Sequence, residues 1–123
     1  MPTSRPLTIT IDLQADPDLQ LRVDVFQVPE SAREEFHGAM RRSLAFLETL
    51  PGFRGHLVLE KTGGPTAFNV ATIAVWESPA AVAAAGEAVR AYYREIGFDP
   101  QLFMARLGVS GEMGNFQAQR SAW

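Results

Sequence analysis

Apolar and polar residues alternate along residues 19–28, and this period is typical of a β-strand with one buried face. One side of this strand carries Leu19, Leu21, Val23 and Val25, and the other side carries Gln20, Arg22 and Asp24. Residues 7–14 alternate in the same way and predict a short extra strand, followed by a turn at residues 15–18.

A helical pattern replaces the alternation after Pro29. Ser31 is a candidate N-cap, and Glu34 completes the pattern of a capping box. Apolar side chains then recur at steps of three and four, which predicts one apolar helical face, and Pro51-Gly52 ends the helix. That face holds Phe36, Met40, Ser43, Leu47 and Leu50, with Ala39 and Phe46 beside them.

Two more strands are predicted at residues 53–61 and 67–76, with a glycine-containing hairpin turn between them. Alternation gives the first of these strands one face with Phe53, Gly55, Leu57 and Leu59, and a second face with Arg54, His56, Val58 and Glu60. The strand at 67–76 is apolar on both faces, so both faces need a cover.

A second helix is predicted to start at Ser78-Pro79, a cap residue followed by proline, and to stop at Gly97. Residues 101–109 are predicted to form a fourth strand. The order β-α-β-β-α-β indicates a ferredoxin-like α+β fold, in which two helices cover one face of a four-stranded antiparallel sheet. The domain would span residues 19–109, between an N-terminal extension at 1–18 and a C-terminal tail at 110–123. The uncovered sheet face predicts a homodimer that packs sheet against sheet.

Composition and charge argue against several kinds of partner. The 11 basic and 14 acidic residues are scattered and give a net charge of −3, so no cationic stripe for nucleic acid is present. The absence of cysteine removes thiolate metal ligands and a cysteine nucleophile. No apolar run is long enough to cross a bilayer and no export signal is recognisable, so we expect a soluble cytoplasmic protein without a membrane partner.

Two stretches of the sequence carry a family resemblance. LPGFRGHLVLE at residues 50–60 and NVATIAVWESPAAV at residues 69–82 resemble the antibiotic biosynthesis monooxygenase family of the dimeric α+β barrel superfamily. The family commonly has Pro-Gly-Phe at the end of helix one and Trp-(Glu)-Ser before helix two. The resemblance implies a dimeric α/β barrel with a pocket between sheet and helices in each subunit, but it does not fix the reaction. We expect a small aromatic substrate or ligand and no cofactor, because no flavin or metal motif is recognisable.

Some positions depart from the pattern that the resemblance implies. The polyketide oxygenases of this family place an Asn four residues before the tryptophan and a Tyr near the start of helix two, where this chain has Thr72 and Val82. Asn69 lies seven residues before Trp76, so strand parity sends it to the opposite face unless a bulge intervenes. Haem-degrading members use a His on helix two and an Asn on the first strand, and neither is present here, so haem degradation is not expected.

Three residues are candidates for catalysis. Trp76 could pack on a planar substrate, or it could simply close the core. Arg106, on the predicted fourth strand, could stabilise a phenolate, or it could form a salt bridge. His56 points to the dimer side or the rim by parity and would be the proton acceptor if it reached substrate.

Thr72, Asn69 and Tyr92 are the candidates for substrate binding, and the two histidines on separate elements do not suggest a metal site. Two hypotheses follow. The first is a cofactor-independent monooxygenase that acts on a phenolic, quinol or polyketide-like aromatic compound. The second is a dimeric module of the same superfamily that binds a small apolar molecule without turning it over.

Overall fold

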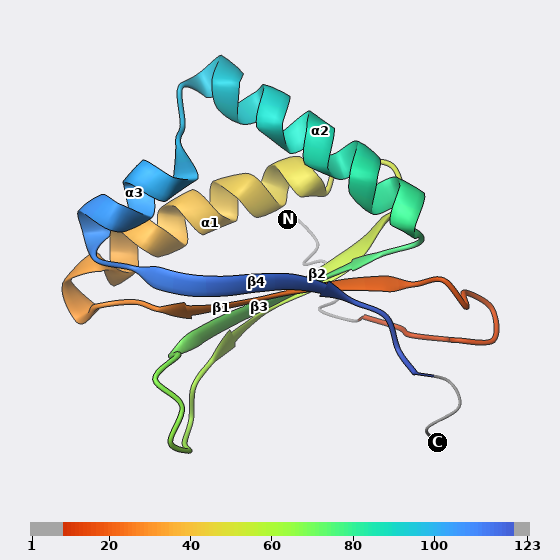
Figure 1. The fold of residues 1–123 in the computed structure, drawn as a ribbon, viewed down its shortest axis with the longest axis horizontal. Coiled ribbons are helices and arrows are strands. Elements are labelled where there is room, and N and C mark those ends of the chain that lie inside the picture. The colour runs from red at the N-terminus through yellow and green to blue at the C-terminus, as the bar shows by residue number, and fades with distance from the viewer. Residues whose placement is uncertain (1–8, 120–123) are drawn as a thin grey trace, which may run out of the picture.

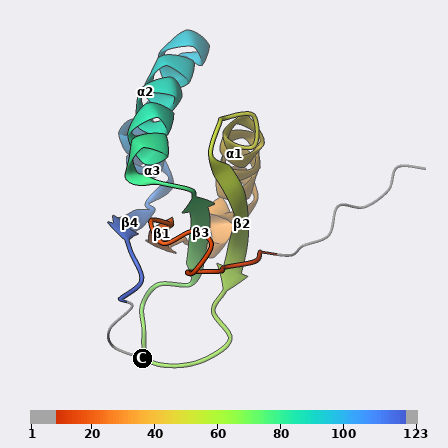
Figure 2. The same cartoon turned by 90° about the vertical axis from the view of Figure 1, so that its right-hand side faces the viewer.

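A four-stranded antiparallel sheet carries the helices of the described residues on one face, which confirms the ferredoxin-like α+β prediction (Figure 1). The computed structural model describes residues 9–119. The sheet order is β2-β3-β1-β4, with β1 at Gln20–Gln27, β2 at Phe53–Glu60, β3 at Val70–Trp76 and β4 at Ser110–Phe116. The helices are α1 at Arg33–Leu47, which follows the 3-10 turn η1 at Glu30–Ala32, then α2 at Pro79–Ile96 and α3 at Pro100–Leu107. Figure 2 shows α1 and α2 side by side above the sheet.

The prediction of a strand at residues 101–109 is wrong, because this segment forms α3. The Asp99 side chain caps α3 by accepting hydrogen bonds from two backbone amides, and Pro100 occupies its first turn. Gly108 ends α3 in the left-handed conformation, with φ of 72°. The fourth strand is β4, which lies in the segment expected to be a tail. Gly111 on β4 lies so close to β1 that a Cβ there would be 2.7 Å from the Phe26 ring.

Two N-terminal predictions also need correction. Residues 9–14 form no strand, and the remainder of the predicted extra strand, residues 7 and 8, lies outside the described residues. The capping box is not formed, because Ser31 lies within η1 and the N-cap of α1 is Ala32, which has no side-chain cap. Ser78 does cap α2, since its Oγ accepts a hydrogen bond from the Ala81 amide at 3.1 Å.

The polar side of β1 faces the helices, which reverses the direction expected from its alternation. Asp24 pairs with Thr72 on β3, and Phe26, two residues along the same side, meets Phe36 of α1 with ring centroids 5.0 Å apart. Leu21, Val23 and Val25 therefore point away from the helices. The charges of β1 are on the helix side of the sheet, and its half-buried aliphatic side chains are on the opposite side.

A bulge in β2 changes which of its residues share a face. Phe53 pairs with Trp76 and Gly55 pairs with the next residue, Val75, so the register shifts between them. His56 consequently lies on the helix side of the sheet with Phe53, and Leu57 and Leu59 lie on the other side. The predicted grouping of Phe53 with those leucines is wrong. We call the side of the sheet away from the helices the open face, and its apolar residues are Leu21, Val23, Val25, Leu57, Leu59, Ala71, Ile73, Val75 and Phe116. Val75 is only 1% exposed, because Ile9 lies over this end of the face beside Gly55.

Candidate active site

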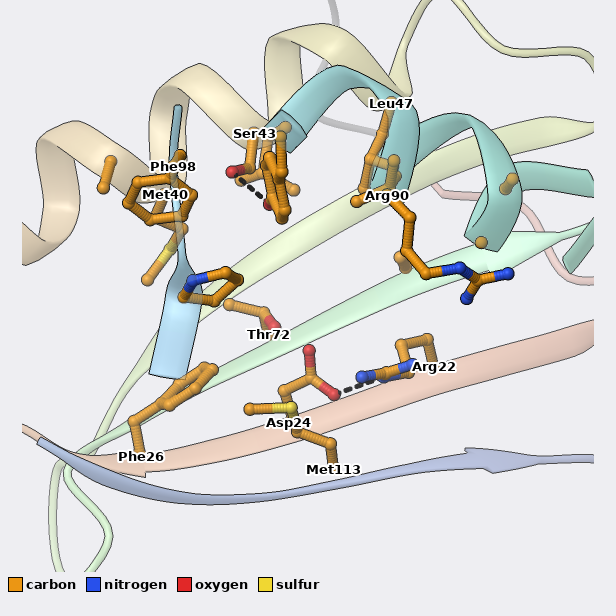
Figure 3. Close-up of a pocket in the computed structure, with 18 of the residues that line it drawn as sticks. Arg22, Asp24, Phe26, Met40, Ser43, Leu47, Thr72, Arg90, Phe98 and Met113 are labelled. Carbon is orange, nitrogen blue, oxygen red and sulfur yellow. Dashed lines mark hydrogen bonds and ion pairs between the residues drawn. The ribbon is translucent and has the colours of Figure 1, made fainter. Parts of the chain in front are cut away.

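A cavity of about 460 Å³ lies between the sheet and the helices (Figure 3). β1, β3 and β4 form its floor, and α1, α2, α3 and the link between α2 and α3 form its walls. Most of the lining is apolar. The aliphatic, aromatic and small residues include Phe26, Phe36, Met40, Leu44, Leu47, Ala74, Val82, Ala85, Val89 and Phe103.

Small side chains on α2 and β3 leave this space open. Ala74 and Ala85 are buried in contact with Trp76, and Gly86 follows on the same helix. A larger side chain at any of these positions would occupy the cavity. The cavity therefore lies beneath the alanine-rich first half of α2.

Trp76 closes one end of the cavity. Its side chain is only 4% exposed, and its ring packs edge to face against Phe53 at a centroid distance of 5.1 Å. Trp76 therefore packs in the hydrophobic core and also lines the cavity, where a ligand could contact its ring. Thr72 lies four residues before Trp76 on β3, so both side chains are on the same face. Thr72 is buried and lines the floor of the cavity.

An ion pair lies on the apolar floor (Figure 3). Arg22 Nε donates a hydrogen bond to Asp24 Oδ1 at 2.6 Å, and the Asp24 side chain is 19% exposed. Burial raises the pKa of Asp24 above its ordinary value, and the hydrogen bond and charge of Arg22 oppose that rise. Alternation on β1 hid this pair, because it assigned the polar side to solvent. The sequence of β3 could have revealed the pair. Because β3 is apolar on both faces, both sides of the sheet need a cover, and the polar side of β1 therefore need not face solvent.

A pair of hydroxyl groups lies on the wall opposite Asp24. Tyr93 Oη and Ser43 Oγ are 2.7 Å apart, one from α2 and one from α1. The predicted binding residue was Tyr92, but Tyr92 stacks on Phe46 at 4.1 Å and does not line the cavity. The tyrosine that reaches the cavity is its neighbour.

Three other predicted site residues also lie outside the cavity. Arg106 is on the exposed side of α3 and forms an ion pair with Glu35 of α1, so it is not a buried charge on a strand. The hydrogen bond from Arg106 lowers the pKa of Glu35. His56 Nδ1 faces Glu48 Oε1 at 4.0 Å beyond Phe53, so it lies neither on the open face nor in the cavity.

Asn69 has a structural role in place of the predicted contact with substrate. Its side-chain amide donates to the Val28 carbonyl and accepts from the Val28 amide, each at 2.8 Å. These two bonds join the end of β1 to the start of β3. Of the six predicted site residues, the cavity contains only Trp76 and Thr72.

The described residues contain neither a metal-binding cluster nor a membrane-spanning helix. Between residues 9 and 119, no group of three or more His, Cys, Asp and Glu side chains could hold a metal ion. In the same range, no helix is both long and apolar enough to cross a bilayer.

Comparison with known proteins gives matches among solved structures. No protein-family model and no curated protein matches the chain. A monooxygenase candidate of Shewanella loihica superposes with a TM-score of 0.64 at 16% identity, over 84% of this chain and 96% of that one. A variant of SnoaB, a cofactor-independent oxygenase from Streptomyces nogalater, gives a TM-score of 0.57 at 25% identity, over 84% of this chain and 95% of that one. The chain has the antibiotic biosynthesis monooxygenase fold.

The same fold also occurs in a haem-degrading protein. MhuD from Mycobacterium tuberculosis matches with a TM-score of 0.51 at 18% identity, over 80% of this chain and 94% of that one, and its structure holds two haems in the active site. Proteins with the antibiotic biosynthesis monooxygenase fold therefore include both oxygenases and haem degraders. The fold alone does not distinguish these functions, so the function has to be inferred from the residues of the cavity.

The two motifs that carried the resemblance meet at one end of this antibiotic biosynthesis monooxygenase fold. Gly52 accepts a hydrogen bond from the Glu77 amide at 2.9 Å, and Phe53 packs against Trp76. Gly52 has φ of 84°, and a Cβ there would lie 2.6 Å from Ala81 Cβ of α2. The Pro-Gly-Phe and Trp-Glu-Ser segments thus join the end of α1 to the start of α2 and fix the tryptophan wall of the cavity.

Proposed function

We propose that the protein is a cofactor-independent monooxygenase that oxidises a phenolic, quinol or polyketide-like aromatic compound in the cavity. The observation that carries this proposal is Asp24, a carboxylate with raised pKa on the floor of an apolar cavity, hydrogen-bonded to Arg22. SnoaB, which shares the fold, is a cofactor-independent oxygenase. The cavity lining among the described residues includes no histidine, so haem is not the proposed compound.

Asp24 is the proposed proton acceptor. Because burial raises its pKa, its carboxylate is a stronger base than a carboxylate in water. When Asp24 takes a proton from a substrate hydroxyl or an activated methylene, the negative charge moves onto the substrate. The Arg22 guanidinium then lies beside the new oxyanion and stabilises it.

The anion supplies the electrons for oxygen chemistry. It passes one electron to O₂, and the substrate radical and superoxide combine to form a peroxide at the ring carbon. For an activated methylene, the protonated peroxide loses water to leave a ketone, so CH₂ and O₂ become C=O and H₂O. All four electrons come from the substrate. The apolar walls and the Trp76 ring hold the aromatic rings and keep bulk water from the peroxide.

Oxygen uptake by the chelator-treated protein tests the proposal. We expect uptake with anthrones or naphthoquinols to exceed autoxidation without enzyme, to saturate with substrate, and to fall strongly in Asp24→Asn and Trp76→Phe. Arg106→Gln is the matched control, because Arg106 lies outside the cavity, and it should keep wild-type uptake. Uptake that is unchanged in Asp24→Asn but lost in Arg106→Gln would contradict the assignment.

A non-catalytic binding module is the second candidate. Val82 lines the cavity where related polyketide oxygenases have a tyrosine, and Thr72 replaces their asparagine. Saturable binding of the same compounds without uptake above autoxidation would favour this module over the enzyme.

We also propose a homodimer that forms through the open face. Leu57 and Leu59 are 37% and 41% exposed there, and Phe116 is 57% exposed, so the subunit presents a broad apolar surface. Ile73→Glu would place a charge at its centre and should convert a dimer mass into a monomer mass in light scattering. A monomer mass for the wild-type protein at micromolar concentration would contradict the dimer.

A further inference from the structure

Among residues 9–119, the lining of the cavity contains one more positive side chain than negative. Its charged lining residues are Arg22, Asp24 and Arg90. Asp24 already accepts the hydrogen bond of Arg22. Arg90 has no hydrogen bond or ion pair with any residue in 9–119. An arginine in the wall of a cavity without an acidic partner favours an anionic ligand group.

The Arg90 side chain folds back over Gly86, one helical turn earlier. Arg90 Nη1 lies 3.4 Å from the place where a Cβ on Gly86 would be, so the guanidinium folds back over a position that has no side chain. Long side chains on a helix tend to point toward its N-terminus, and the N-terminal end of α2 is the end next to Trp76. Figure 3 shows Arg90 reaching down from α2 on the same side of the cavity as Arg22.

This side of the cavity is also its entrance. Met113 on β4 is 51% exposed, and Asn115 and Arg90 are exposed, although all three line the cavity. On the α1 side, Phe36 is buried and the other lining residues are half-buried. The more exposed side lies between α2 and β4, and a ligand that enters there would direct its rings inward and leave a substituent near Arg90.

We propose that Arg90 binds a carboxylate of the substrate at this entrance, so that the substrate is an aromatic hydroxy acid. The planar guanidinium matches a carboxylate with two parallel hydrogen bonds. The carboxylate at Arg90 leaves the hydroxyl or activated methylene inside, near Asp24. This inference rests on the proposed function for the choice of an oxidisable ring, but the binding of the anion does not require turnover.

Binding without oxygen separates the two proposals. Calorimetric titration under nitrogen would compare a hydroxynaphthalene carboxylate with its carboxamide, which has the same shape and no charge. We expect the wild-type protein to bind the carboxylate at least about fivefold more tightly, since a charged hydrogen bond to an exposed arginine is worth about 1 kcal/mol or more. Arg90→Gln should remove that preference and leave carboxamide binding unchanged.

Arg94→Gln is the matched control, because Arg94 lies on the next turn of α2 and does not line this cavity. It should keep the wild-type preference, and circular dichroism would verify that both variants are folded. Three results overturn the inference: equal binding of the two compounds by the wild type, a preference that survives in Arg90→Gln, or no measurable binding of the carboxylate. A carboxylate preference without oxygen uptake would retain the Arg90 site and reject only the oxygenase.

Discussion

One methyl group added at Gly52 should strongly lower the free energy of unfolding. It lies between α1 and β2, with φ of 84°, and a Cβ there would come within 2.6 Å of Ala81 Cβ. Carbon atoms in contact are normally about 3.5–4.0 Å apart, so the Gly52→Ala variant must move the first turn of α2 by about 1 Å. The hydrogen bond from Glu77 to the Gly52 carbonyl would be disturbed by the same movement.

Two separate costs add in the Gly52→Ala variant. A residue other than glycine in the left-handed conformation costs about 1–2 kcal/mol. Overpacking against Ala81 costs about 1–3 kcal/mol more. We therefore expect the free energy of unfolding, measured by urea denaturation, to fall by roughly 2–5 kcal/mol.

A double-mutant cycle separates the two costs. Ala81→Gly removes the clashing methyl group and should itself cost at most about 1 kcal/mol in a helix. Gly52→Ala combined with Ala81→Gly should keep the backbone cost and lose the overpacking, so the double variant should be about 1–3 kcal/mol more stable than the sum of the single effects. Additivity within about 0.5 kcal/mol would refute the contact as the source of the instability.

Three further predictions concern side chains around the cavity. Asp24→Asn should gain stability relative to wild type as pH rises: the folded pKa of Asp24 is raised, so its contribution to stability is present below the unfolded pKa of about 3.9 and is lost as pH rises through the folded pKa. Thermal melts of both proteins across this range would show the widening difference, and a constant difference would contradict it. Asn69→Ala should lower the unfolding free energy by about 1–3 kcal/mol, because Val28 loses both of its partners, whereas Asn69→Asp should retain the acceptor only. Tyr93→Phe should cost about 1 kcal/mol in urea denaturation, and no loss would mean that the Ser43 hydroxyl finds another partner.

Five of the six regular elements predicted between residues 19 and 109 were found close to their predicted bounds. Strong local signals explain this success, such as the Ser78-Pro79 start and the Gly97 stop of α2. The strand predicted at residues 101–109 was wrong because a short apolar run is compatible with either a strand or a helix. The Asp99-Pro100 start and the Gly108 stop are helix signals, and the segment forms α3. The strand β4 was missed because it is an edge strand with glycines and polar residues, and its pairing with β1 is not a local property.

The candidate site was harder to predict than the fold. Trp76 and Thr72 were placed correctly because β3 has regular alternation up to its end. His56 was misplaced by the bulge at Gly55, which shifts the face of every later residue on β2. Arg22 and Asp24 were missed because alternation identifies two faces of a strand but does not say which face meets the helices.

The inward charges of β1 have a consequence for product release. A phenolic or quinol substrate presents a hydroxyl donor to Asp24, but its oxidation product presents a carbonyl, so two acceptors would face each other after the reaction. The hydrogen bond that helps to hold the substrate is then lost, and an unpaired buried acceptor is unfavourable by about 1–3 kcal/mol. The rings fit the cavity equally well before and after. The ion pair on the floor would therefore let the cavity distinguish product from substrate by the presence of one hydroxyl proton. This difference would favour release of the product without a conformational change.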